Sequence, residues 1–126
     1  MMLRWLLRIT ALYLGVLGAA ALLVPQAAAS NLGQPLTPFD VFATRTIGAI
    51  LLTVAILNWS ASASTRAPTG VVLANVFLNA ALGVVNAIAT VDGTIGAGSW
   101  SGVAIHAALV LAFSLCHFLR RRPQLA

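Results

Sequence analysis

Charged residues are scarce in this chain of 126 residues: only 7% are charged, against about 25% in an average soluble domain. Hydrophobic residues make up 60%, and the mean hydropathy is +0.99. So few charges cannot cover a water-soluble globule, which excludes an ordinary cytosolic enzyme, and the apolar content excludes a disordered tail. The net charge of +5 comes from arginines that flank apolar runs. This pattern is typical of a membrane protein and indicates no nucleic-acid partner.

Cysteine is nearly absent too. The single Cys116 cannot form an internal disulfide, which excludes a disulfide-stapled secreted module. Its neighbour His117 points about 100° away on a helix, which disfavours a nucleophilic pair. His106 lies about 16 Å before His117 along a helix, so one copy cannot hold a metal ion with both, and a bis-histidine haem would require a symmetric dimer. We therefore predict no catalytic, cofactor-binding or metal-binding residues, and no enzymatic activity.

Long apolar runs are what the chain has instead. Each covers roughly 18 to 21 residues. At about 1.5 Å per residue, such a helix is about 27–31 Å long, close to the hydrocarbon thickness of a bilayer. The runs cover residues 5–24, 41–60, 70–90 and 102–119. They predict an all-α fold, an integral membrane four-helix bundle, with residues 1–126 forming a single transmembrane domain.

The first run has some features of a secretory signal peptide. Arg4 and Arg8 come at its start, and the alanine-rich stretch 27–30 offers a processing site. The run is nevertheless longer than the 7–15 apolar residues that are usual in signal peptides. We expect it to be retained as the first transmembrane helix.

The arginines also predict the orientation of the spans. With four spans and a cytoplasmic N-terminus, Arg45 lies towards the outer side, together with Asp40 and Asp92. The other six arginines lie inside: Arg4, Arg8, Arg66, Arg120, Arg121 and Arg122. This distribution follows the positive-inside rule, so we expect both termini in the cytoplasm and the protein in the inner (plasma) membrane. The tryptophans agree, because Trp5 and Trp59 fall at one interface and Trp100 at the other.

Small residues recur every four positions in three of the runs. The series are Ala11, Gly15 and Ala19; Asn79, Gly83 and Ala87; and Ala104, Ala108, Ala112 and Cys116. Small residues let helix backbones approach closely in lipid. Besides the lipid bilayer, we therefore expect a protein partner or a homo-oligomer that packs on these helix faces.

Three asparagines in the third run form a narrow stripe. Asn75, Asn79 and Asn86 lie within about 40° of each other around a helix. A carboxamide that faces lipid is costly, so the stripe should face protein or water. It predicts either hydrogen bonds between helices, which we favour because no charged residue joins the stripe, or a polar lining for a small solute or ion.

A second group of polar residues lies near the outer face. Asp40 and Arg45 begin the second run, Asp92 follows the third, and His106 lies near the start of the fourth. An arginine just inside a span is expected to extend towards the interface or to pair with an acid. These four residues predict either an ion pair that anchors helix ends or a site for an anionic headgroup or small acid.

The layout resembles small bacterial four-helix membrane proteins of the DoxX-like kind. The resemblance rests on a first helix that ends at Pro25, on the sequence of 45–49, on Asp92-Gly93 and on the basic end of the chain. It implies a four-helix fold and gives little information on activity. This chain has His106 where such proteins often carry an acid, and Asn86 where they tend to have an arginine.

The chain thus offers helical surfaces and little chemistry. This favours an accessory or scaffolding subunit of a larger membrane assembly. The alternative is a homo-oligomeric carrier or channel for a small solute, lined by Asn75, Asn79 and Asn86.

Overall fold

The structure is a computed structural model that describes the backbone of residues 1–29, 35–64 and 67–121 and side chains as far as residue 119. Its elements are α1 (Met2–Leu23), the short α2 (Pro25–Ala28), α3 (Pro38–Ala63), α4 (Thr69–Val91), the 3-10 turn η2 (Ala97–Ser99) and α5 (Trp100–Arg121). The helices α1, α3, α4 and α5 are long and apolar enough to cross a membrane, which confirms the predicted all-helical fold with four candidate spans. Ser30, the last residue of the predicted processing site at 27–30, lies outside the described residues, and so do Arg66, Arg122 and the side chains of Arg120 and Arg121.

Polar residues and glycine set the ends of the long helices. Thr37 and Asp40 form a capping box in which the Thr37 hydroxyl accepts from the Asp40 backbone N–H at 3.2 Å, while the Asp40 carboxylate accepts from the Thr37 N–H at 2.9 Å. For this reason α3 begins at Pro38, ahead of the apolar run at 41–60. At the end of α4, Gly93 adopts a φ of +72°, a left-handed conformation that glycine accepts without strain.

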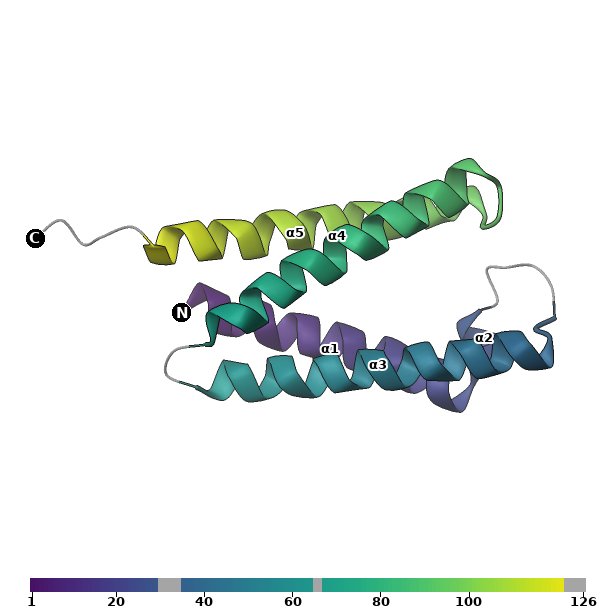
Figure 1. The fold of residues 1–126 in the computed structure, drawn as a ribbon, viewed down its shortest axis with the longest axis horizontal. Coiled ribbons are helices and arrows are strands. Elements are labelled where there is room, and N and C mark those ends of the chain that lie inside the picture. The colour runs from purple at the N-terminus through teal and green to yellow at the C-terminus, as the bar shows by residue number, and fades with distance from the viewer. Residues whose placement is uncertain (30–34, 65–66, 122–126) are drawn as a thin grey trace, which may run out of the picture.

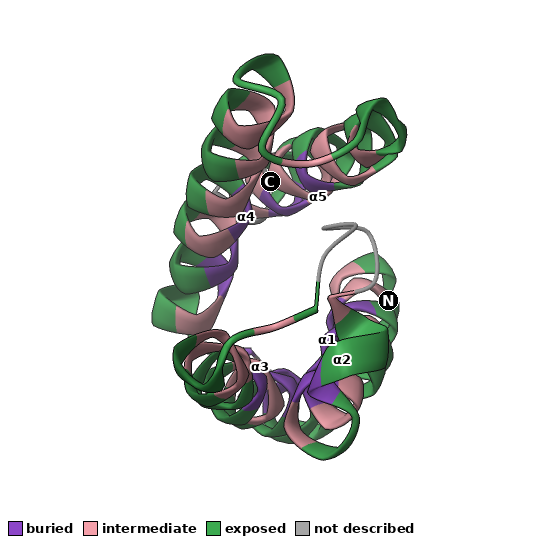
Figure 2. Cartoon of the chain, turned by 90° about the vertical axis from the view of Figure 1, so that its right-hand side faces the viewer, coloured by how far each residue is buried: buried purple, intermediate pink, exposed green. Residues whose placement is uncertain are grey.

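The four long helices form two antiparallel pairs, α1 with α3 and α4 with α5 (Figure 1). The start of α1 and the end of α5 lie at the same end of the bundle, which we name the Arg4 end; the other is the Asp92 end. The pairs lie close together at the Arg4 end and diverge towards the Asp92 end. Viewed along the bundle, the buried residues of the two pairs face each other across the molecule (Figure 2).

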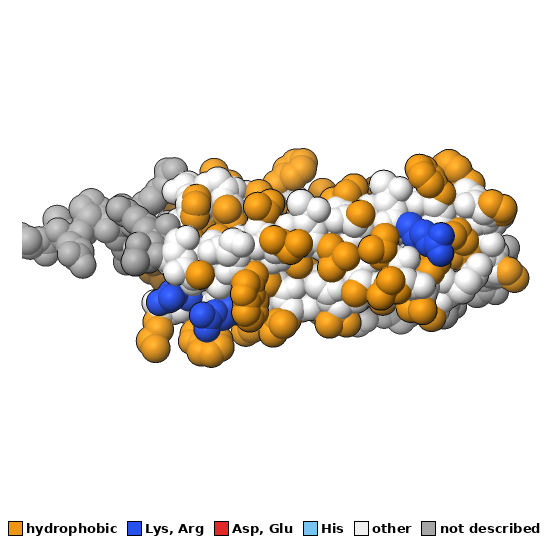
Figure 3. Space-filling model, turned by 90° about the horizontal axis from the view of Figure 1, so that it is seen from below, with side chains coloured by type: hydrophobic (Ala, Val, Ile, Leu, Met, Phe, Trp, Pro, Cys, Tyr) orange, Lys and Arg blue, Asp and Glu red, His pale blue; other side chains and the backbone are white. Residues whose placement is uncertain are grey.

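The surface of the bundle is apolar, and its interior holds polar side chains beside apolar ones. Large apolar side chains are exposed on all four long helices, for example Val16, Ile56, Phe77 and Leu111. The buried set includes asparagines, a threonine, a serine and a histidine. Arginine side chains lie near the ends of the face seen in Figure 3, and large apolar side chains cover its middle. Lipid solvates the apolar exterior, so this distribution fits a bilayer.

Two glycines allow α1 and α3 to touch backbone to backbone. A Cβ atom at Gly18 would lie 2.8 Å from the Gly48 carbonyl oxygen, and one at Gly48 would lie 2.8 Å from the Gly18 oxygen. Real Cβ atoms do not approach that closely, so both positions require glycine. Of the other small residues on α1, Ala11 is buried, whereas Ala19 is only half-buried. The predicted small-residue face of α1 is therefore used within the chain, but its centre lies at Gly18.

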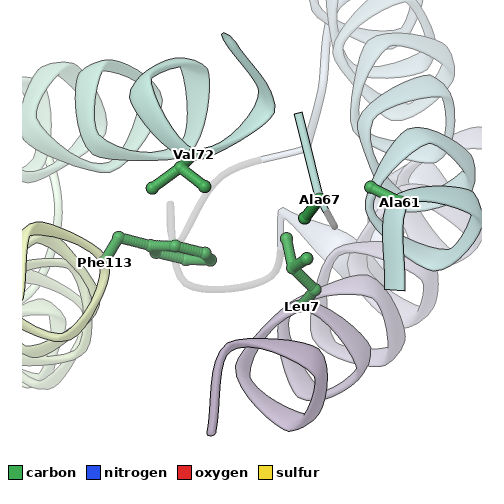
Figure 4. Packing of buried hydrophobic residues seen from close by; sticks show 5 residues of the cluster. All are labelled: Leu7, Ala61, Ala67, Val72 and Phe113. Carbon is green, nitrogen blue, oxygen red and sulfur yellow. The ribbon is translucent and has the colours of Figure 1, made fainter. Parts of the chain in front are cut away.

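The two pairs are joined at the Arg4 end by a small apolar core. Leu7 from α1, Val72 from α4 and Phe113 from α5 meet there, with Ala61 and Ala67 beside them (Figure 4). Leu7 and Phe113 have no exposed surface. This core holds the two pairs together at one end of the bundle.

Candidate functional site

A cluster of four polar side chains lies among the apolar helices. Asn58 comes from α3, Asn75 and Asn79 from α4, and His106 from α5. Their exposed fractions are 0%, 1%, 1% and 6%. We name these four residues the polar cluster.

Hydrogen bonds run through the polar cluster from α3 to α5. Asn58 and Asn75 exchange a reciprocal pair of amide bonds, with Nδ2–Oδ1 distances of 2.9 and 2.7 Å. Asn79 donates from Nδ2 to the backbone oxygen of Asn75 at 2.8 Å, and its Oδ1 lies 2.9 Å from Nδ1 of His106. The cluster thus links the two helix pairs through Asn58 and Asn75, and links α4 to α5 through Asn79 and His106.

These bonds also fix the tautomer of a neutral His106. Because Asn79 uses Nδ2 as a donor to Asn75, the atom that faces His106 is its Oδ1, which can only accept. Nδ1 of His106 must then donate and carry the proton, which leaves Nε2 as an acceptor. Among the described residues, Nε2 has no hydrogen-bond partner.

The structure divides the predicted asparagine stripe. Asn75 and Asn79 lie together in the polar cluster, whereas Asn86 is half-buried near the Asp92 end and lies against Gly102 at the start of α5. Asn86 there lines a small hollow with Ile95, Gly98, Ser99, Ser101 and Gly102. The reason is that Asn86 lies about two helical turns beyond Asn79, where the two helix pairs have already diverged.

Asn58 is the member of the polar cluster that the sequence analysis missed. It stands alone in the second apolar run, so no stripe marked it. A signal was nevertheless present, since a carboxamide inside an apolar run needs a partner in lipid. Counted from the connection between α3 and α4, Asn58 and Asn75 also lie at similar depths, as partners must.

The four residues predicted at the outer rim fall into separate environments. Asp40 belongs to the capping box, where its carboxylate also accepts from the Thr37 hydroxyl at 2.6 Å. His106 is buried and bonded to Asn79. Arg45 and Asp92 are exposed, and no ion pair involves them within the part of the chain that the structure describes. The prediction placed His106 at the outer rim. Its side chain instead lies on the face of α5 that packs against α4, where it contacts Asn79.

An apolar groove of about 500 Å³ runs between α4 and α5. We name it the α4–α5 groove; its lining includes Ala80, Gly83, Ala87, Val103, Ala107 and Val110. Ala80 and Ala107 are exposed. Two members of the predicted small-residue series of α4, Gly83 and Ala87, thus line a surface that is open to the outside. On α5, Ala104 and Ala108 are likewise exposed, whereas Cys116 is buried.

The remaining candidates for chemistry lie apart from the polar cluster. His117 is half-buried and stacks edge-on against Phe118, with ring centroids 6.0 Å apart. Within residues 1–29, 35–64 and 67–119, no group of three His, Cys, Asp or Glu side chains is placed to hold a metal ion.

Comparison with protein-family models, curated proteins and solved structures finds no match.

Proposed function

We propose that the chain is an accessory or scaffolding subunit of a larger membrane assembly, resident in the inner (plasma) membrane of a bacterium with both termini in the cytoplasm. The observation that carries this proposal is the α4–α5 groove, an open apolar surface built around small residues. The bacterial setting is the one that the resemblance to DoxX-like proteins implies.

The α4–α5 groove suits a transmembrane helix of a partner. In lipid, helices associate by close packing, and small residues let two backbones approach. Ala80, Gly83 and Ala107 provide such a surface, whereas many exposed positions elsewhere carry large side chains such as Val16, which lipid tails solvate. A partner helix would gain close contacts here that flexible lipid chains make less well.

The polar cluster supports a scaffolding role. Its amide groups bond to one another and to the backbone, so they hold helices in fixed positions. Each such bond in a membrane contributes about 1 kcal/mol. By linking α3 to α4 and α4 to α5, the cluster sets the position of the α4–α5 groove relative to the α1–α3 pair.

The orientation rests on the arginines. Arg4 and Arg8 lie at the Arg4 end, and the sequence places Arg66 and Arg120–Arg122 on the same side of four spans. Asp40 and Asp92 both lie at the opposite end. The positive-inside rule then assigns the Arg4 end to the cytoplasm.

Filling the groove tests the proposed function. Ala107→Phe should reduce co-purification of a stoichiometric partner from native membranes in mild detergent by about tenfold or more, because a clash in a packed helix interface costs well over 1 kcal/mol. Ala49→Phe makes the same change at an exposed position of α3 outside the groove and should leave the association intact. Quantitative mass analysis of the purified material measures both. The accessory proposal fails if no partner is found at stoichiometric yield, or if the two variants behave alike.

A homo-oligomeric carrier or channel for a small solute is the second candidate function. It is favoured by two polar groups that have no hydrogen-bond partner among the described residues: the hydroxyl of Thr10, which is buried, and Nε2 of His106. A solute that donates a hydrogen bond would satisfy Nε2. Flux of such a solute into liposomes that contain only this protein, abolished by His106→Phe, would favour the carrier over the accessory subunit.

A further inference from the structure

Two arginines at the Arg4 end are anchored to the end of α3. Arg4 and Arg8 lie one turn apart on the same face of α1. Nε of Arg4 donates to the backbone oxygen of Ser62 at 3.0 Å, and Nε of Arg8 donates to the Ser62 hydroxyl at 3.5 Å. Ser62 is itself fixed, since it is buried and its hydroxyl donates to the Trp59 backbone oxygen at 2.6 Å. Both guanidinium groups are therefore held close to Ser62 at the end of α3.

Two aromatic rings lie close to the Arg8 guanidinium. Its guanidinium carbon lies 5.4 Å from the ring centroid of Trp5 and 5.9 Å from that of Trp59. Such contacts restrict the side chain and leave the polar edges of the guanidinium available. Half-exposed tryptophans are also the side chains that prefer the headgroup level of a bilayer. We therefore expect the arrangement to lie at the depth where lipid phosphates are found.

The positive charge of this pair is not neutralised within the described part of the chain. Asp40 and Asp92 are the two acids, and both lie at the opposite end of the bundle. Two arginines four residues apart on a helix repel each other. A guanidinium has five N–H donors, and each arginine uses one of them on Ser62. The pair thus retains donors and a net charge that an anion would satisfy.

A hollow of about 190 Å³ adjoins the two arginines. It is lined by Met1, Arg4, Trp5 and Arg8. Figure 3 shows basic side chains together at this end, with large apolar side chains beside them. Donors next to an apolar surface match a molecule that carries a phosphate and acyl chains.

We propose that Arg4 and Arg8, positioned by Ser62 and by the rings of Trp5 and Trp59, form a binding site for the phosphate of an anionic phospholipid. The phosphate oxygens accept from the guanidinium groups, and the acyl chains lie along the exposed apolar side chains of α1 and α3. This site is independent of the α4–α5 groove and of the polar cluster.

Quenching of tryptophan fluorescence by brominated lipids tests the site. The chain has three tryptophans, so a Trp100→Phe background leaves Trp5 and Trp59 as reporters next to the arginines. In phosphatidylcholine bilayers, brominated phosphatidylglycerol should bind near these rings about fivefold better than brominated phosphatidylcholine. Arg4→Gln/Arg8→Gln should reduce this preference to about one. Arg45→Gln, which removes an arginine at the opposite end, should leave it unchanged.

Three results would overturn the proposal. Equal quenching by the two lipids in the parent protein would show that no site selects the anionic headgroup, and this comparison requires no arginine variant to fold. An unchanged preference in the double variant would show that the arginines do not form the site. Loss of the preference on adding inorganic phosphate, at an ionic strength held constant with chloride, would show that the site takes free phosphate in preference to the lipid headgroup.

Discussion

Gly48→Leu should force α1 and α3 apart and lower the free energy of unfolding by about 3 kcal/mol. Even a Cβ atom at this position would lie 2.8 Å from both the Gly18 oxygen and the Leu22 backbone nitrogen. Backbone atoms cannot turn away as a flexible side chain can, so the helices must separate and lose packing along their whole contact. Reversible unfolding in mixed micelles, followed by helicity and tryptophan fluorescence, measures the change.

Gly70→Leu is the matched control for this prediction. Gly70 lies in the first turn of α4, and a Cβ atom there would meet nothing within 4 Å. The same substitution should therefore leave stability unchanged or raise it slightly, since leucine favours a helix more than glycine does. If Gly48→Leu and Gly70→Leu unfold alike, the backbone contact between α1 and α3 is not formed.

Asn75→Leu should lower the free energy of unfolding by about 2 kcal/mol, because it leaves the buried amide of Asn58 without its partner. Asn58→Leu should cost about as much for the reciprocal reason. The double variant Asn58→Leu/Asn75→Leu should be more stable than the sum of the two changes predicts, since no amide is then left unpaired. The coupling should be about 1 kcal/mol, within the range found for hydrogen bonds between membrane helices.

Asn86→Leu is the control for the polar cluster. Asn86 is on the same helix but is only half-buried and lies near Gly102, outside the cluster. The change there should cost less than Asn75→Leu in the same unfolding measurement. Strict additivity of the Asn58 and Asn75 variants would show that the two amides do not interact.

Hydropathy could predict the helices because span length is set by bilayer thickness, a property of the solvent. It could not predict their ends, which depend on local groups. The start of α3 was readable in principle from Thr37 and Asp40, whose spacing is that of a capping box before an apolar run. The short α2 follows from Pro25 at its first position, a signal that also marks the end of α1.

Part of the candidate site could be predicted from helix periodicity. The periodicity of Asn75 and Asn79 showed that they share a face, but it could not identify the helix that they face. That depends on tertiary packing, which brings Asn58 and His106 to them. The same limit explains the error in the predicted outer-rim site. His106 and Arg45 were grouped because both lie near helix ends in the sequence, but the side chain of His106 turns towards Asn79.

The most direct test of the four-span topology is to determine on which side of the membrane Ser64 and Ser99 lie. Ser64 follows α3 at the Arg4 end, and Ser99 precedes α5 at the Asp92 end. With single cysteines at these positions in a Cys116→Ala background, an impermeant maleimide should label Ser99→Cys in intact cells, and Ser64→Cys only after the membrane is permeabilised. That result follows from four spans with a cytoplasmic N-terminus. Equal labelling of both positions from outside would contradict the four-span bundle.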